Sequence, residues 1–332
     1  MPDNPVVSVC IATFQHAPYI EQCIESALMQ QTNFPFEILL GEDESTDGTR
    51  EICKAYAEKY PGKIRLFLRS RKDVIYINGN PTGRFNAIQN FLEAKGKYIA
   101  LLEGDDYWSD PLKLQKQFDI LETHPEIIVC HHWQKIASLN ASGEYEETKA
   151  PTEGQGYYPE TIATVREIFE NRLRIKSRTM FFRNIFLDGY KLPDWYFKLQ
   201  FGDVPLCMIF GKFGNFYFLD EEMAVYRITA KGVAGTGRKN FLFTFNHFTE
   251  WIRIWEQGNI FFNREYEKET LRTIAYFYTV ILERYNYSFT IFRMCTKNVM
   301  FKSKLTHMSR MRILSGLYGK ATAGRLKRIF NK

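Results

Sequence analysis

The sequence predicts an α/β protein with a mostly parallel sheet flanked by helices, followed by a helical, basic C-terminal extension. Short apolar runs of strand length alternate with longer amphipathic segments over the first 131 residues, which is typical of a doubly wound parallel sheet. Two of these runs end abruptly on carboxylates. From residue 239 onward the pattern becomes helical and rich in aromatic residues.

The first half of the chain supplies most of the predicted sheet. Its strands are expected at the bounded apolar runs, in chain order 6–12, 36–41, 63–68, 97–103 and 127–131. Its helices are expected where apolar residues recur at helical spacing, at about 18–29, 47–60, 84–94 and 111–123. Residues 69–83 are polar, with Asn, Gly and Pro, and predict a loop.

The second half continues with weaker patterns. Residues 138–160 predict a long loop or a β-excursion, and a helix is expected from about 161 to 171. A strand at 177–183 and a helix at 202–213 follow. The runs 216–219 and 223–227, separated by three acidic residues, predict a hairpin.

The strand at 97–103 is the centre of the functional prediction. It ends on Glu103, Asp105 and Asp106, at the sheet edge where ligands of open α/β sheets bind. Clustered carboxylates repel one another unless a cation lies between them, so we expect Mg²⁺ or Mn²⁺ bridging to a diphosphate. The alternative is an acidic turn before the next helix, for which Asp110 and Pro111 make a good start.

Composition narrows the class of protein. The chain has 332 residues, 45% of them hydrophobic, and six scattered cysteines without a CxxC pair, as expected for free thiols in a reducing compartment. No signal peptide or membrane-spanning run is evident, so a cytoplasmic protein is predicted.

The charge is unevenly distributed along the chain. Residues 284–332 hold 12 Lys and Arg and no acid, leaving 32 basic against 38 acidic residues in the rest. Such a tail suggests an anionic partner surface. It could lie on the inner face of the cytoplasmic membrane, or its helices could pack on the catalytic domain. Nucleic acid is not expected, because the body is acidic and nucleic-acid motifs are missing.

Several segments together resemble the family 2 nucleotide-diphospho-sugar glycosyltransferases, of the Rossmann-like GT-A fold and bacterial surface-polysaccharide type. In chain order the matching segments are residues 7–14 (VSVCIATF), 41–49 (GEDESTDGT), 96–108 (GKYIALLEGDDYW), 202–206 (GDVPL) and 225–227 (VYR). The resemblance implies a GT-A catalytic domain at 1–238, with a nucleotide-binding half at 1–110 and an acceptor-binding half at 111–238. The helical region 239–332 matches no family motif.

The resemblance also implies roles for individual residues. Thr13 and Asp43 would hold the nucleobase, Asp105 the ribose, and Asp106 the metal. Asp203 would be the catalytic base that takes the proton from an acceptor hydroxyl, giving inversion. From the pattern alone, a helix N-cap is the favoured interpretation of Asp203, and the resemblance reverses that preference. Glu42 and Glu103 stand where the family more often has Asp.

Three further residues are candidates with ordinary structural alternatives. Arg84 could contact the nucleotide or simply begin a surface helix. Trp108 could stack on a sugar or belong to the core, and Arg227 could close over the diphosphate. Glu103 remains a candidate substrate contact.

These assignments predict an inverting, metal-dependent transferase. Its donor would be a nucleoside-diphosphate sugar, with UDP as the expected nucleotide, and its acceptor a glycan or lipid-linked hydroxyl in polysaccharide biosynthesis. A nucleotidyltransferase is the enzymatic alternative, although Thr13 to His16 form no glycine-rich nucleotide loop. A non-catalytic sugar-nucleotide-binding scaffold is the other, disfavoured by retention of Asp43, Asp105, Asp106 and Asp203.

Overall fold

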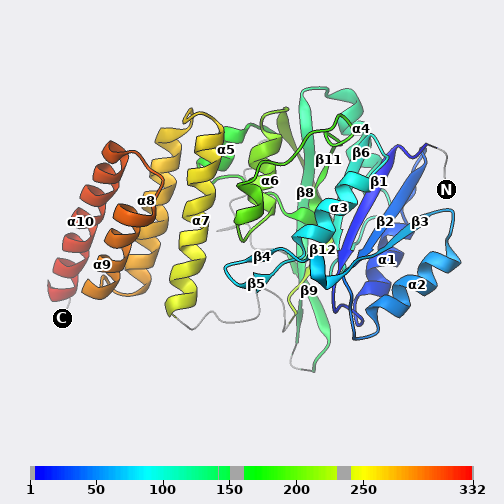
Figure 1. Cartoon of the computed structure of the whole chain (residues 1–332), viewed down its shortest axis with the longest axis horizontal. Coiled ribbons are helices and arrows are strands. Elements are labelled where there is room, and N and C mark those ends of the chain that lie inside the picture. Colours follow the sequence, from blue (N-terminus) through cyan, green and yellow to red (C-terminus); the bar gives the residue numbers. More distant parts are fainter. Residues whose placement is uncertain (1–3, 141, 150–160, 230–240, 331–332) are drawn as a thin grey trace. The chain divides into compact units, whose positions relative to one another are not determined.

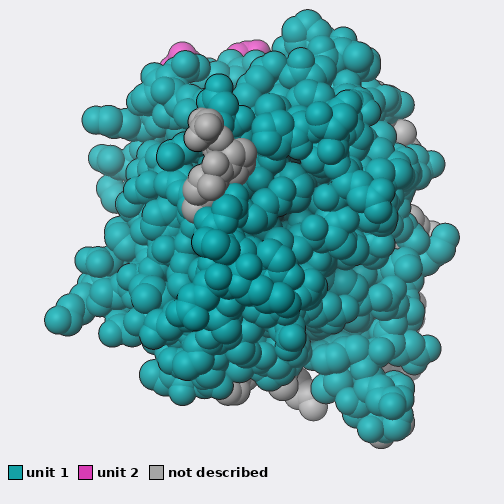
Figure 2. Space-filling model, turned by 90° about the vertical axis from the view of Figure 1, so that its right-hand side faces the viewer, with its two compact units in different colours: residues 1–165, 174–236 teal, residues 166–173, 237–332 magenta. Residues whose placement is uncertain are grey.

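The structure, a computed structural model, describes residues 4–140, 142–149, 161–229 and 241–330, and for 325–330 the backbone alone. The chain divides into two compact units, coloured separately in Figure 2. Unit 1 comprises Met1–Val165 and Arg174–Thr236, and unit 2 comprises Arg166–Leu173 and Gly237–Lys332. The predicted boundary between residues 238 and 239 lies outside the described residues.

Unit 1 is built on a large mixed sheet (Figure 1). Its path runs β10-β12-β8-β11-β6-β1-β2-β3, with β7 paired to β12 and β9 to β8. Neighbouring strands are parallel from β6 through β1 and β2 to β3, and β8 and β12 are also parallel. The short β11 is antiparallel to both β6 and β8. The strands are β1 (Val7–Thr13), β2 (Phe36–Glu42), β3 (Ile64–Leu68), β6 (Tyr98–Glu103), β7 (Tyr107–Trp108), β8 (Ile127–Leu139), β9 (Tyr145–Lys149), β10 (Ile162–Ala163), β11 (Phe181–Arg183) and β12 (Asn215–Arg227).

Helices cover both faces of this sheet. Because side chains alternate along a strand, Val7, Val9 and Ile11 pack into one core with Ile20 and Ile24 of α1. On the other face α3 packs on β1 and β2, and Asn90 Nδ2 donates to the Ile11 carbonyl at 2.9 Å. The helices of unit 1 are α1 (Ile20–Leu28), α2 (Thr49–Lys59), α3 (Arg84–Glu93), α4 (Lys113–Thr123) and α6 (Asp203–Phe210), while α5 (Val165–Phe169) begins at its boundary.

The predicted α/β class with a helical C-terminal region is confirmed, and most elements of the first half lie where expected. Residues 69–83 contain a short 3-10 turn η1 (Arg71–Asp73) and a small hairpin of β4 (Tyr76–Ile77) and β5 (Asn80–Pro81). Residues 177–183 begin with a 3-10 turn, η2 (Ser177–Thr179), and another, η3 (Tyr196–Lys198), precedes α6.

The predicted hairpin at 216–227 is wrong. Both runs belong to the single strand β12, which stays parallel to β8 with register shifts between Leu219 and Glu222 and between Glu222 and Ala224. The intervening acidic residues therefore form a bulged stretch, which inserts residues without reversing the chain. The predicted helix at 161–171 is also too long, because residues 162–163 form β10 and α5 has only five residues.

Unit 2 is helical. Its long helices are α7 (Phe241–Phe261), α8 (Glu267–Arg284), α9 (Phe289–Lys297) and α10 (His307–Phe330), with the π-helical turn η4 (Asn298–Lys302) after α9. Phe169 enters this core by stacking on Tyr266, with 4.6 Å between ring centroids, and its carbonyl accepts from Trp255 Nε1 at 2.8 Å. No helix within the described ranges is both long and apolar enough to cross a membrane.

Candidate active site

Three neighbouring strand ends form the candidate site. Parallel pairing places Ala12 of β1 opposite Glu103 of β6, and Thr13 opposite Glu42 of β2. The acids that follow β2 and β6 therefore meet beside Thr13, as the sequence predicts. A Cβ on Gly104 would lie 2.4 Å from Thr13 Oγ1, so only glycine lets the two strand ends approach this closely.

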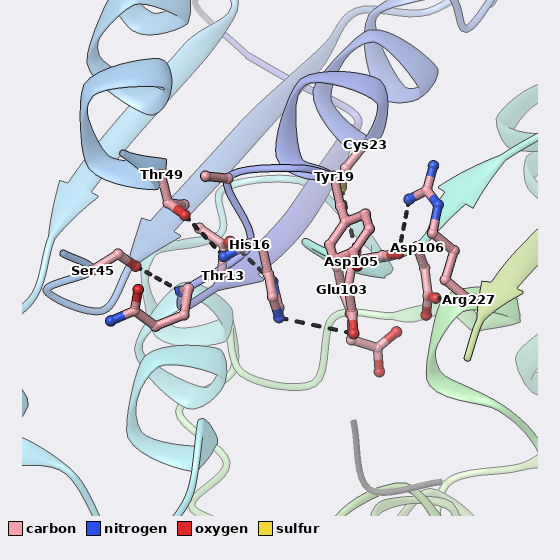
Figure 3. Close-up of polar contacts among 12 residues, drawn as sticks. Thr13, His16, Tyr19, Cys23, Ser45, Thr49, Glu103, Asp105, Asp106 and Arg227 are labelled. Atoms are coloured by element: carbon pink, nitrogen blue, oxygen red, sulfur yellow. Dashed lines mark hydrogen bonds and ion pairs between the residues drawn. The ribbon is translucent and has the colours of Figure 1, made fainter. Parts of the chain in front are cut away.

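Thr13 is connected to the acid tip of β6 through a histidine (Figure 3). Its buried hydroxyl contacts His16 Nδ1 at 3.2 Å, and His16 Nε2 lies 3.8 Å from Asp105 Oδ2. The Asp105 side chain is 21% exposed, so one predicted ligand-binding carboxylate is open to an incoming group. The Thr13-to-Asp105 connection joins two residues that were predicted separately for nucleobase and ribose.

Asp43 lies at the end of β2 with one oxygen paired and the other unpaired. Arg71 Nη1 donates to Asp43 Oδ2 at 2.7 Å, and the Arg71 guanidinium stacks on Phe14 with 4.0 Å to the ring centroid. Asp43 Oδ1 is buried and lacks a hydrogen-bond partner among the described residues. Burial raises the pKa of Asp43, and Arg71 opposes that rise. A buried acceptor without a donor is the contact that a ligand N–H would complete.

The neighbouring Glu42 has a different role. It is fully buried, pairs with Arg50, and accepts from the backbone N–H of Ser45 at 2.7 Å. Both of its oxygens are therefore used within the protein, which explains how glutamate is accommodated here.

Asp106 is held inside the protein on both of its oxygens. Its side chain is 1% exposed. Oδ2 pairs with Arg178 Nε, and Oδ1 accepts from the backbone N–H of Arg227 at 2.9 Å. Asp106 thereby joins the β6 tip to η2 and β12, and a metal at this carboxylate would have to use a remaining lone pair of an oxygen that already accepts a hydrogen bond. Its predicted role as metal ligand stays a prediction.

Arg178 is a buried cation within the acid cluster. Its Nη1 donates to Gln134 Oε1 at 2.6 Å, its guanidinium lies 4.2 Å from the Tyr226 ring centroid, and its Nε is 3.7 Å from Glu103 Oε2. Burial lowers the pKa of Arg178, but the neighbouring carboxylates of Asp106 and Glu103 raise it by more than burial lowers it. The guanidinium therefore stays charged. Glu103 also accepts from Ser177 Oγ.

Arg227 forms a second cationic contact at the tip. Its Nη1 donates to the Asp105 carbonyl at 2.8 Å, its Nη2 donates to Gln22, and its guanidinium lies 4.4 Å from the Tyr107 ring centroid. The side chain is buried. Arg227 thus orients the backbone that presents Asp105, and its predicted contact with a diphosphate remains a prediction.

Asp203 lies apart from these strand ends, as the first residue of α6. Its Oδ1 accepts from the Val204 N–H at 2.9 Å, and within the described residues it makes no hydrogen bond or ion pair with the acid tip. The Asp203 carboxylate interacts electrostatically with Lys176. Burial lowers the pKa of Lys176, and the negative charge of Asp203 partly offsets that decrease. The short segment from Lys176 to Arg178 thus links the surroundings of Asp203 to Asp106.

Two predicted contact residues have structural partners. Arg84 is buried, stacks on Tyr196 and donates to the carbonyls of Tyr196 and Gln200, which fixes the segment before Asp203. Trp108 is 1% exposed, donates from Nε1 to the Arg178 carbonyl at 3.0 Å, and lies under Lys113 Nζ. These contacts favour a positioning role for Arg84 and the core alternative for Trp108.

Carboxylate oxygens at the tip suit a hard divalent cation. Asp105 is partly open, and Glu103 Oε2 is buried with no hydrogen-bond partner in the part of the chain that the structure describes. No cluster of three or more His, Cys, Asp or Glu in the described parts of the chain is arranged to hold a metal. One or two carboxylates, completed by diphosphate oxygens, is a normal set for Mg²⁺ or Mn²⁺, so the residues present fit a metal shared with a bound nucleotide.

Comparison with known proteins decides the family. The family model described as glycosyl transferase family 2 matches residues 8–190. The chain belongs to glycosyl transferase family 2. An uncharacterized protein of Mycobacterium tuberculosis is 30% identical over 244 residues, 73% of this chain and 65% of the relative. The chain thus spans slightly less than two thirds of that relative's length. TuaG of Bacillus subtilis, named for teichuronic acid biosynthesis, is 36% identical over 36% of this chain and 42% of its own.

Solved structures confirm the GT-A fold expected for family 2. Residues 1–349 of TarS from S. aureus, in complex with UDP-GlcNAc, superpose with a TM-score of 0.54 at 17% identity, over 97% of this chain and 92% of that one. The mannosyltransferase PcManGT from Pyrobaculum calidifontis, in complex with GDP-Man and Mn²⁺, gives 0.53 at 12% identity over 100% and 89%. At these identities the likeness concerns the fold.

Proposed function

We propose that this family 2 protein is an inverting, metal-dependent glycosyltransferase of polysaccharide biosynthesis. It would move a sugar from a nucleoside-diphosphate sugar to a hydroxyl of a glycan or lipid-linked acceptor. The observation that carries the proposal is the meeting of Thr13, Asp43 and Asp105 at adjacent strand ends, where Asp43 Oδ1 has no hydrogen-bond partner among the described residues and Asp105 is partly exposed. TarS and PcManGT have been crystallised with donors of this chemical class.

The unpaired oxygen of Asp43 supports a uracil-containing donor. Uracil carries an N3–H that can donate to a buried acceptor, whereas cytosine has no N–H at that ring position. A nucleotide without an N–H at this position would leave Asp43 Oδ1 buried and unpaired, at the desolvation cost of a buried acceptor. The site should therefore bind UDP more tightly than CDP. Thr13, whose hydroxyl contacts His16, lies beside it and would border the same nucleotide.

For the metal, the geometry favours Asp105 as the protein carboxylate. The Asp106 side chain is 1% exposed and accepts from Arg178 and from the Arg227 N–H, whereas the Asp105 side chain is 21% exposed. A bound Mg²⁺ or Mn²⁺ would supply Lewis-acid stabilisation of the departing diphosphate. Arg227 would keep the Asp105 backbone in place, and Asp106 would hold the tip to η2 and β12.

Asp203 is proposed as the general base. It lies at the start of α6, with one oxygen on the Val204 N–H, and the other would accept the proton from the acceptor hydroxyl as that oxygen attacks the anomeric carbon. A single displacement of this kind inverts the configuration. Arg84 would position the base through the carbonyls of Tyr196 and Gln200. We further propose that the enzyme is cytoplasmic and lies peripherally on the inner face of the cytoplasmic membrane.

The test compares Asp203→Asn with Asp194→Asn, a control at an exposed aspartate in the same part of the chain. Transfer from a panel of sugar nucleotides with Mn²⁺ is measured alongside UDP affinity. Asp203→Asn should lower the turnover about 10²–10⁴-fold with UDP affinity unchanged, and the control should be fully active. Full activity of Asp203→Asn would remove the base assignment, and release of pyrophosphate would indicate a nucleotidyltransferase instead.

A further inference from the structure

The outer surface of α9, η4 and α10 in unit 2 combines apolar and cationic side chains. These helices already bury one apolar face each, through Ile291 and Cys295 on α9 and Ile313 and Leu317 on α10. A second set of large apolar side chains points outward and is between 41% and 79% exposed. This outer set comprises Met300, Phe301, Met308, Met311 and Tyr318.

The outer set lies on two adjoining elements, η4 and α10. On α10, Met308, Met311 and Tyr318 follow at spacings of three and seven residues, which places them along one side of a helix. Met300 and Phe301 lie within η4, which packs against α10. Tyr318 also contacts Phe292 of α9, with 6.4 Å between ring centroids. The outer set therefore lies on two elements that pack together, and α10 also contacts α9.

Cations accompany this surface, and the three elements themselves contain no acidic residue. Arg293, Lys297, Lys302 and Arg312 are exposed, and none of them takes part in an ion pair among the described residues. The sequence has no Asp or Glu from residue 284 to its end. The outer set is thus accompanied by positive charge that the segment itself does not neutralise.

We infer that the outer set, with these four cations, is the surface on which the protein binds an anionic lipid bilayer. Flexible methionines and aromatic rings can enter the boundary between headgroups and acyl chains while Lys and Arg pair with anionic headgroups. A second copy of this face is disfavoured, because it would bring two sets of unpaired cations together. The lipid surface satisfies both the charge and the exposed apolar area.

This inference specifies the membrane position included in the proposed function and involves none of the transfer chemistry. The two are therefore separable by experiment. Hydrolysis of a soluble sugar nucleotide, measured without vesicles, tests the chemistry. Vesicle flotation of the full chain tests the surface, whatever the outcome of the first assay.

The flotation experiment compares phosphatidylcholine vesicles with vesicles that also contain phosphatidylglycerol. One variant replaces Arg293, Lys297, Lys302 and Arg312 with Gln, and a matched control replaces the exposed unit 1 residues Lys54, Lys59, Lys95 and Lys191 with Gln. Each basic residue near an anionic surface contributes about a five-fold factor, so the first variant should bind at least about 100-fold more weakly. The control should bind much more tightly than the first variant.

A second variant tests the apolar part. Phe301→Ser with Met311→Ser changes only exposed side chains and should lower vesicle binding about ten-fold or more while leaving thermal stability unchanged. Equal binding of the unmodified protein to neutral and anionic vesicles would overturn the inference. So would an equal loss of vesicle binding in the variant of Arg293, Lys297, Lys302 and Arg312 and in the unit 1 lysine control. So would a concentration-dependent dimer that Phe301→Ser abolishes in the absence of lipid.

Discussion

Arg178 provides the sharpest test of how the acid tip is built. Its guanidinium pairs with Asp106, whose side chain is 1% exposed, and donates to Gln134 at 2.6 Å. Arg178→Gln would leave Asp106 buried without its charged partner. Removing one member of a buried ion pair costs about 3–5 kcal/mol, a large part of the roughly 5–15 kcal/mol by which domains are usually stable.

The measurement is urea denaturation, together with amide hydrogen exchange in β6 to report on unit 1. Lys97→Gln is the control in the same unit, because Lys97 pairs with Glu122 and the two side chains are 58% and 39% exposed, and exposed pairs contribute only about 0–1 kcal/mol. Arg178→Lys keeps the charge but loses the planar fork that reaches both Asp106 and Gln134. It should therefore lie between the wild type and Arg178→Gln in stability.

A double-mutant cycle separates the pair from general packing. Asp106→Asn should also destabilise the protein, and the double variant should lose at least about 1.5 kcal/mol less than the sum of the two single losses. Two results would refute the reasoning. One is a loss for Arg178→Gln no greater than that for Lys97→Gln. The other is simple additivity in the cycle.

Three other predictions concern metal binding, recognition of the nucleobase, and the dependence of stability on pH. Asp105→Asn should weaken Mn²⁺ binding in the presence of UDP by at least about ten-fold, or 1.4 kcal/mol, and electron paramagnetic resonance would measure this binding. Asp106→Asn should change it much less, and the reverse order would restore Asp106 as the ligand. Asp43→Ala should weaken UDP binding by about 1.5–3 kcal/mol in calorimetry and reduce the preference for UDP over CDP; an unchanged preference would contradict the assignment. Burial lowers the pKa of His131 to about 3, so the unfolded chain binds a proton below about pH 6.5 that the folded chain does not. The free energy of unfolding should therefore decrease as the pH is lowered, by about 2 kcal/mol between pH 7.5 and 5 from this residue. His131→Phe should remove that part of the pH dependence, measured by urea denaturation.

Local patterns predicted the parts of the fold that depend on them. Strand-length apolar runs, helical spacing and acids after β2 and β6 correctly placed most elements of the first half and brought Thr13, Asp43 and Asp105 together. The pattern failed at β12, because a bulge and a turn both use a few polar residues between apolar runs. Which one forms depends on pairing with β8, about 90 positions away in the chain.

The arginines of the site could not be predicted in the same way. Arg71 and Arg178 lie far along the chain from the carboxylates they contact, and nothing in their local sequence distinguishes them from surface cations. Arg178 follows Arg174 and Lys176 at alternate positions, a pattern that signals one-sided charge in an extended segment. That signal alone does not identify Asp106 as a partner.

These arginines change the reason for expecting a metal. From the sequence, three clustered carboxylates require a cation between them. In the structure two guanidinium groups already lie at the tip, Arg178 against Asp106 and Glu103, and Arg227 against the backbone carbonyl of Asp105. Repulsion among the acids is therefore largely offset without a metal, and Asp105 alone provides weak affinity for one. Metal binding should then depend on the diphosphate, which brings both additional oxygen ligands and additional negative charge.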